Sequence, residues 1–424
     1  MKSRVVFALA LTLAGLGQAS SVAAAQKVPD RPKLPAGADT NDANTYYGFG
    51  LSQVDHDPET SAASFYWATR LNPNMAPAFY ARRVALLLED RYRLLKYWQG
   101  DEGTAKSKDI KQIDSLYYHA LTLDPFVPQS LDRNIFEAVL DQISHNMERE
   151  TGESADQLRF ELQQYMFDAP VDLRAWQAET DGRIGEALKL YAQAIDAAKF
   201  KASLRIDRAG VFYQMAQMDS ALAELTAAAA EMRKRDNKDL VYVYDSKALL
   251  DERIAVVNLR LGRMDAAKNA LGQALQEDLS YSPAHIYLAY MAMQSKDTTT
   301  ALSEMDLAVQ LRPDDPAMQF AYGAMLVNDG RPDDAEPHLR EAIKLDDVYA
   351  APHFMLGALL DKRGTAPAAV AEYTTFLNMA ARADAWRPAA TARVKALGGA
   401  GGPGGPGGPG GPGGPGAPTP GAKQ

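Results

Sequence analysis

The chain has no cysteine among its 424 residues, which excludes disulfide bonds, thiol catalysis and cysteine-ligated metal sites. It also lacks the short motifs of common enzymes. There is no His-Glu-x-x-His zinc motif, no Gly-x-Ser-x-Gly nucleophile motif, no phosphate-binding Gly-rich loop followed by Lys-Ser/Thr and no dinucleotide fingerprint. These absences predict a protein that is not an enzyme and that uses no cofactor and no metal.

An excess of basic residues is also missing. Lys and Arg number 45 against 54 Asp and Glu, which gives a net charge of −9 at pH 7. Short basic stretches, such as residues 233–235, are flanked by acidic residues. The charge balance therefore disfavours nucleic acid and anionic lipid as partners.

Long apolar runs are absent except at the N-terminus. Lys2 and Arg4 precede an apolar run over residues 5–16, and small residues for cleavage follow at 23–25. This order is typical of a secretory signal peptide, and the run is shorter than the roughly 20 residues that span a bilayer. An amphipathic first helix is the alternative, but the run lacks a polar face. We expect residues 1–25 to be removed, and the mature chain, with no transmembrane helix, to be exported as a periplasmic or secreted protein.

What the sequence does have is a 34-residue period within residues 248–383, in segments that begin at Ala248, Ser282, Pro316 and Ala350. The eighth place of each segment holds only Ala or Gly, and the twentieth place always holds Ala. These residues are Ala255, Ala289, Gly323 and Gly357 at the eighth place and Ala267, Ala301, Ala335 and Ala369 at the twentieth. Three of the four segments have a glycine at the same place near their middle, namely Gly262, Gly330 and Gly364. The second segment has Lys296 at that place.

This pattern resembles the tetratricopeptide repeat, in which each unit consists of two antiparallel helices. The resemblance implies an all-α, right-handed superhelical solenoid, because neither helix can bury its apolar face without a stacked neighbour. Weaker matches extend the repeats toward the N-terminus, with two units in residues 170–235 and a tetratricopeptide-like region in residues 44–168. The chain is thus expected to form about nine helix pairs.

Other segments have their own compositions. Residues 26–43 are rich in Pro, Asp, Gly and Ala and predict an extended leader, and residues 90–108 predict an insertion. Residues 126–168 keep helical periodicity without the repeat signature, so they are either a degenerate unit, which we favour, or a functional insertion. Residues 384–397 predict a capping helix, and residues 398–424, with five Gly-Gly-Pro triplets, predict a disordered tail.

The resemblance also implies where a partner binds, because inner helices in this family line a concave surface that receives peptides or proteins. The corresponding places here are mostly apolar and aromatic, which is typical of a recognition surface. The alternative is that these side chains pack against one another as core. We expect a groove for a protein or peptide partner lined by Ile286, Tyr290, Met293, Phe320, Val327, Asn328, Phe354 and Asp361.

The function expected on this basis is that of a protein-protein interaction scaffold or adaptor in the cell envelope or outside the cell. A second hypothesis is an enzyme or an enzyme-assembly factor, for example in polysaccharide or envelope assembly, that acts through residues 90–168. A deep pocket that gathers Asp132, Glu137, Asp141 and His145 would favour it, whereas a helix pair stacked like its neighbours would count against it. The oligomeric state is left open.

Overall fold

The computed structural model describes residues 29–90, 108–127, 133–166, 170–236, 246–381 and 384–398. Within these ranges the chain forms 19 α-helices and no strand, so the predicted all-α class is confirmed. The predicted signal peptide, the Gly-Gly-Pro triplets and most of the predicted insertion at 90–108 lie outside the described residues.

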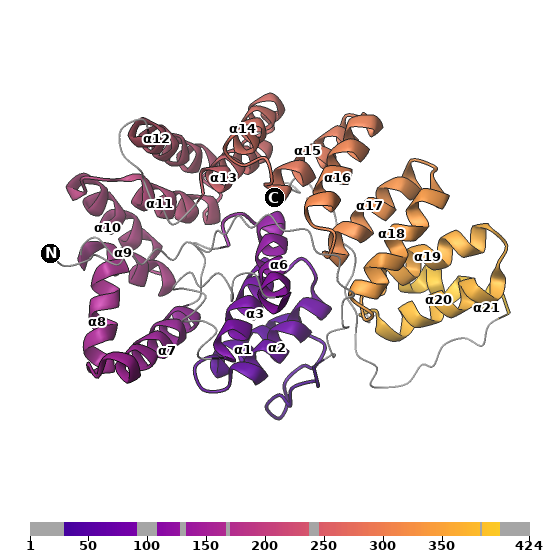
Figure 1. Ribbon diagram of the computed structural model, residues 1–424, viewed down its shortest axis with the longest axis horizontal. Helices are drawn as coiled ribbons and strands as arrows, with labels where there is room; N and C mark the ends of the chain where they lie inside the picture. Colours follow the sequence, from indigo (N-terminus) through magenta and orange to yellow (C-terminus); the bar gives the residue numbers. More distant parts are fainter. Residues whose placement is uncertain are drawn as a thin grey trace.

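The described helices form nine consecutive pairs and a terminal helix (Figure 1). The first four pairs are α1 (Ala43–Gln53) with α2 (Pro58–Leu71), α3 (Ala76–Leu88) with α6 (Lys108–Leu123), α7 (Arg133–Thr151) with α8 (Ala155–Met166), and α9 (Pro170–Thr180) with α10 (Ile184–Ala197). The next is α11 (Ala202–Gln214) with α12 (Met218–Asp236). The four 34-residue units follow as α13 (Lys247–Arg260) with α14 (Met264–Glu277), α15 (Ser282–Gln294) with α16 (Thr298–Leu311), α17 (Pro316–Asn328) with α18 (Pro332–Leu345), and α19 (Ala350–Lys362) with α20 (Ala366–Met379). The terminal helix is α21 (Arg387–Ala396).

One residue with a positive φ makes the turn within each 34-residue unit. Gly262, Gly330 and Gly364 have φ angles of 72°, 78° and 77°, a left-handed conformation that glycine adopts without steric cost. Lys296 takes the same place in the second unit with a φ of 62°. The packing of the two helices therefore imposes this conformation even where the residue is not glycine.

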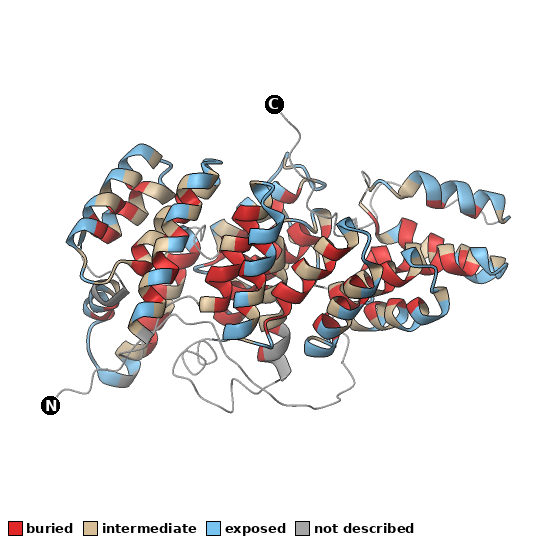
Figure 2. Cartoon of the chain, turned by 90° about the horizontal axis from the view of Figure 1, so that it is seen from above, coloured by how far each residue is buried: buried red, intermediate tan, exposed pale blue. Residues whose placement is uncertain are grey.

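Small residues lie where the two helices of a unit cross. The alanines at the twentieth place are fully buried in all four units. A Cβ atom added to Gly323 would lie 3.0 Å from the Leu339 side chain, and one added to Gly357 would lie 3.0 Å from the Tyr373 ring. Figure 2 shows the buried residues concentrated between the helices, with exposed residues along the outer sides and the turns.

The first four described helices, α1, α2, α3 and α6, do not simply continue the stack; we call them the N-terminal module. Figure 1 shows them on the concave side of the arch that the later pairs form. Helix α6 packs against α15, and α1 and α3 pack against α7. One hydrophobic cluster includes Ile113 and Tyr117 of α6 together with Leu271 of α14 and Tyr287 of α15. The chain therefore folds back on its own repeats.

The described part of the leader packs on this module. Arg31 donates a hydrogen bond from Nε to the Tyr46 hydroxyl at 2.7 Å, and its guanidinium lies over the Tyr46 and Trp67 rings at 5.3 and 5.0 Å. Trp67 donates from Nε1 to the Pro29 carbonyl at 3.2 Å. These contacts hold the leader against α1 and α2.

Helix α21 covers the last pair, as a terminal helix must where a stack would otherwise expose its apolar end. The Trp386 ring, just before α21, stacks on Phe354 with 4.8 Å between ring centroids and 16° between planes. Arg393 forms two hydrogen bonds to the Asp361 carboxylate, at 2.6 and 2.8 Å. The end of the solenoid is thus closed by contacts to two residues of the inner helix α19.

Candidate functional site

The predicted groove residues lie on the inner helices α15, α17 and α19, but they differ in accessibility. Ile286 and Phe320, each at the fifth place of its unit, are only 7% and 3% exposed and belong to the hydrophobic core. Tyr290, Met293 and Val327 are half-buried, and Asn328 is exposed. Accessibility on α15 and α17 therefore increases from the start of each inner helix toward its end.

The repeats themselves bury Ile286 and Phe320, and the N-terminal module contacts the repeats near the same ends of the inner helices. The Tyr287 hydroxyl donates to the Thr122 carbonyl at 3.3 Å, and the Arg312 guanidinium lies 3.3 Å from the centre of the Tyr118 ring. Val348, just before α19, packs against the module's aromatic cluster, which includes Trp67. The module thus lies beside this edge of the concave surface.

Charges accompany these contacts at the turn between α18 and α19. Burial raises the pKa of Asp346, although the nearby Arg70 and Arg82 cations act in the opposite direction. Burial also raises the pKa of Tyr66 to about 12. Two arginines of the module thus lie close to a partly buried carboxyl group of the repeats, so the contact between module and repeats is electrostatic as well as apolar.

At the far end of the predicted groove, contacts within the chain already involve Phe354 and Asp361. The Phe354 ring packs against Tyr373 and Phe376 as well as Trp386. The hydrogen bonds from Arg393 lower the pKa of Asp361, which therefore remains an ionised partner of Arg393. The terminal helix thus covers this end of the predicted groove.

Between these two covered regions lies a smaller surface formed by Tyr290, Met293, Val327 and Asn328, which we call the open concave surface. Tyr290, Met293 and Val327 all pack at the edge of one hydrophobic cluster, which fixes their positions on α15 and α17. Burial raises the pKa of Tyr290, so its hydroxyl is neutral at physiological pH and can donate a hydrogen bond. The surface combines apolar, aromatic and amide groups, the chemistry of a protein-binding patch.

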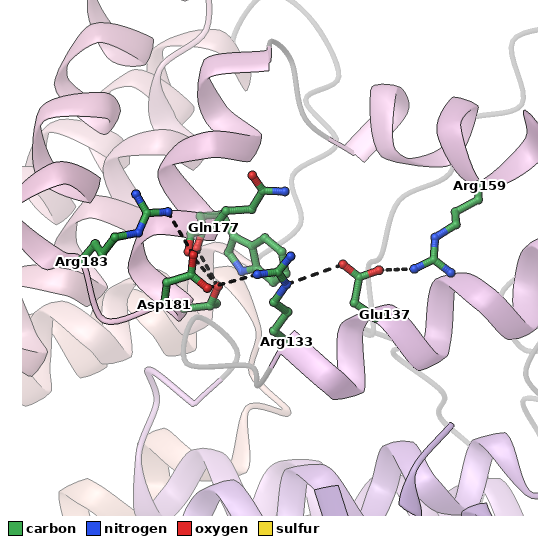
Figure 3. Close-up of polar contacts among 8 residues, drawn as sticks. Arg133, Glu137, Arg159, Gln177, Asp181 and Arg183 are labelled. Carbon is green, nitrogen blue, oxygen red and sulfur yellow. Dashed lines mark hydrogen bonds and ion pairs between the residues drawn. The ribbon is translucent and has the colours of Figure 1, made fainter. Parts of the chain in front are cut away.

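Glu137 and Asp141, two carboxylates of the second hypothesis, form ion pairs with arginines, and Figure 3 shows those of Glu137. Arg159 of α8 pairs with Glu137 and, at 3.1 Å, with Asp141, both on α7. Arg133 at the start of α7 lies 3.1 Å from Asp181 in the turn between α9 and α10. The arginines neutralise these carboxylates and tie two consecutive helix pairs together, α7 with α8 and α9 with α10.

The remaining residues of that hypothesis do not complete a site. His145 is exposed, and its Nδ1 lies 2.8 Å from the Asp141 carbonyl oxygen. Asp132 lies outside the described residues. In the part of the chain that the structure describes, no group of three or more His, Asp or Glu residues could hold a metal ion. Helices α7 and α8 form a helix pair joined at Gly152, which has a φ of 76°.

Sequence patterns did not indicate which inner residues are covered. The module reaches the repeats through carbonyl oxygens such as that of Thr122, and a carbonyl group carries no side-chain signature. Arg393, which binds Asp361, could have been suspected only from its charge at the end of the repeats.

The helix pairs, their 34-residue period and the left-handed turn residues together decide the architecture. The fold is a tetratricopeptide-like solenoid. No protein-family model matches its sequence, and no curated protein matches it. No helix in the described ranges is both long and apolar enough to cross a membrane.

Several solved structures are similar to parts of this tetratricopeptide-like chain. A MamA fragment from Desulfovibrio magneticus is 15% identical, with a TM-score of 0.34, over 41% of this chain and 92% of its own. YrrB, described as a tetratricopeptide protein with an unusual peptide-binding site, is 19% identical, with a TM-score of 0.36, over 45% of this chain and 91% of its own. The C-terminal part of a tetratricopeptide protein from Cytophaga hutchinsonii is 13% identical, with a TM-score of 0.41, over 53% of this chain and 82% of its own.

Proposed function

We propose that this protein is an interaction scaffold that holds a protein or peptide partner on its open concave surface. The observation that carries the proposal is the position of Tyr290, Met293, Val327 and Asn328 between two regions covered by the chain itself. Partly exposed apolar groups anchored on rigid helices favour binding, since little side-chain entropy is lost when a partner covers them.

The buried residues of the predicted groove have a supporting role in this proposal. Ile286 and Phe320 position the inner helices from within the core, and Phe354 and Asp361 hold the terminal helix. A partner therefore contacts the ends of α15 and α17 rather than the whole length of the inner helices.

The proposal places the scaffold in the cell envelope or outside the cell. The support is the N-terminal sequence, where two basic residues, a short apolar run and three alanines follow in order. Fractionation of source cells followed by N-terminal sequencing tests this part. A mature chain that begins at Gln26 in the periplasmic or extracellular fraction is expected, whereas an unprocessed chain in the cytoplasm would contradict it.

Binding is tested by cross-linking capture from an envelope extract with the full mature chain. The test variant carries Met293→Asp and Val327→Asp, which place charges on the open concave surface. The matched control carries Leu279→Asp and Leu307→Asp, at residues that are 81% and 41% exposed and lie outside that surface. A partner captured by the wild type and the control but lost with the test variant supports the proposal. Equal capture by all three proteins refutes it.

A further inference from the structure

The segment Tyr118–Val127, at the end of α6 and in the turn that follows, is held by the repeats in the way that a groove holds a peptide. Its contacts come from α11, α13 and α15, the first helices of three consecutive pairs, and from the loop after α16. We call this segment the internal ligand. Tyr287, one of the residues that hold it, lies 165 positions from its partner Thr122 in the sequence.

Phe126 is the anchor of the internal ligand. Its ring stacks on Tyr213 of α11 with 4.0 Å between centroids and 16° between planes, and the Arg253 guanidinium lies 5.7 Å from its centre. The ring is 1% exposed and shares a hydrophobic cluster with Ala209 of α11 and Val257 of α13. A single aromatic side chain buried between two inner helices is the typical hot spot of a recognition site.

Carbonyl groups of the internal ligand are recognised as well. Arg253 donates from Nε to the Pro125 carbonyl at 2.9 Å, and the Tyr287 hydroxyl donates to the Thr122 carbonyl at 3.3 Å. Arg253 is fully buried, so its cation is sheltered from water at the point of contact. These bonds set the depth and direction of the backbone without regard to side-chain identity.

The segment also contains hydrogen bonds of its own that hold its turn. The Asp124 carboxylate accepts a hydrogen bond from the Phe126 amide at 2.9 Å, and the Val127 amide donates to the Asp124 carbonyl at 3.1 Å. Such an Asx-turn, with proline at its second position, has few conformations to lose on binding. Tyr118, which lies on α6 about one helical turn before Thr122, packs under the Arg312 guanidinium.

We propose that the inner surface of α11, α13 and α15 is a binding site for peptides of the type Tyr-x5-Asp-Pro-Phe, a helical turn followed by an Asp-Pro-Phe turn. In this structure the chain's own internal ligand fills the site. A partner segment of the same chemistry enters by exchange with the internal ligand. The site is separate from the open concave surface, so Met293→Asp is expected to leave peptide binding at this site unchanged.

The test uses the full mature chain and a fluorescein-labelled peptide of residues 115–127, SLYYHALTLDPFV, as the probe in fluorescence polarisation. Phe126→Ala in the protein weakens the internal ligand and leaves the receptor helices intact, so this variant is expected to bind the peptide at least tenfold tighter than the wild type. Phe376→Ala is the matched control, since it removes a fully buried phenylalanine from the last pair, and it is expected to bind as the wild type does.

Two further controls locate the binding. Tyr213→Ala added to Phe126→Ala is expected to lose the peptide, and a peptide with alanine in place of Phe126 is expected to bind at least tenfold more weakly. Equal peptide affinity for the wild type, Phe126→Ala and Phe376→Ala would overturn the proposal. If Phe126→Ala fails to fold, Tyr118→Ala takes its place, because Tyr118 is only half-buried. A folded Tyr118→Ala protein that takes up no more peptide than the wild type would overturn it equally.

Discussion

Helix α1 contains two glycines, two positions apart, that the structure places in opposite environments. Gly48 is exposed, and a Cβ atom added there would meet nothing within 4 Å. A Cβ atom added at Gly50 would lie 2.7, 2.9 and 3.0 Å from three ring carbons of Phe65. Phe65 is fully buried in α2, so its ring has no room to retreat. Gly50 is thus the point of closest approach between the first two helices.

Alanine at either position gains about 1 kcal/mol of helix propensity over glycine. Overpacking against Phe65 costs about 1–3 kcal/mol in addition at Gly50 alone. We therefore expect Gly48→Ala to raise the free energy of unfolding by about 1 kcal/mol, and Gly50→Ala to leave it unchanged or lower it by up to about 2 kcal/mol. The difference between the variants isolates the packing effect, since helix propensity is common to both.

Urea unfolding followed by circular dichroism measures both free energies, and hydrogen exchange of the α1 amides reports whether the change is local. A Gly50→Ala protein as stable as Gly48→Ala would refute the reasoning, because it would mean that α1 and α2 do not approach as closely as the structure shows. Loss of amide protection throughout the chain in Gly48→Ala would refute it as well.

Two further predictions concern strain and ionisation. Lys296→Gly is expected to stabilise the protein by about 0.5–1 kcal/mol in urea unfolding. A lysine in the left-handed conformation costs about 1–2 kcal/mol, and the greater entropy of glycine in the unfolded chain offsets part of the gain from its removal. Gly262→Ala is expected to destabilise the protein for the same reason. An unchanged midpoint for both would contradict the turn geometry. Burial raises the pKa of Glu252 from its usual 4.5 to about 8, although the hydrogen bond from Tyr281 opposes the shift. Between pH 4.5 and about 8 the Glu252 carboxyl therefore keeps its proton in the folded state and loses it in the unfolded state. The stability that Glu252 contributes is complete below pH 4.5 and is lost as the pH rises through 8, at up to about 1.4 kcal/mol per pH unit. Glu252→Gln should flatten this part of the stability profile, and an identical profile in the variant would show that Glu252 is ionised in the folded protein.

The sequence predicted the helical class and the repeat geometry well because these depend on local spacing. The expected start of the second segment, Ser282, is also the first residue of α15, and even the exception at Lys296 adopts the left-handed turn. Small side chains that recur every 34 residues mark the places where the two helices of a unit pack against each other.

The environment of the candidate groove could not be predicted in the same way. Spacing placed Ile286 and Phe320 at the fifth place of their inner helices, but it carried no information on the module that lies beside that end of the surface. The contacts responsible join residues such as Thr122 and Tyr287, which no period relates. The part of the concave surface that lies beside the module depends on where the chain returns to itself, and that is a property of the whole arch.

The return of the N-terminal module also sets the number of units. In an open repeat array each unit touches only its neighbours, so units can be gained or lost with little effect elsewhere. Here α6 meets α15, and the intervening pairs from α7 to α14 form the span of a closed loop. Insertion or deletion of one pair in that span would carry α15 away from α6. Val348, just before α19, also packs against the module, so the closed loop extends through α18. The copy number in this part of the chain is therefore constrained by geometry.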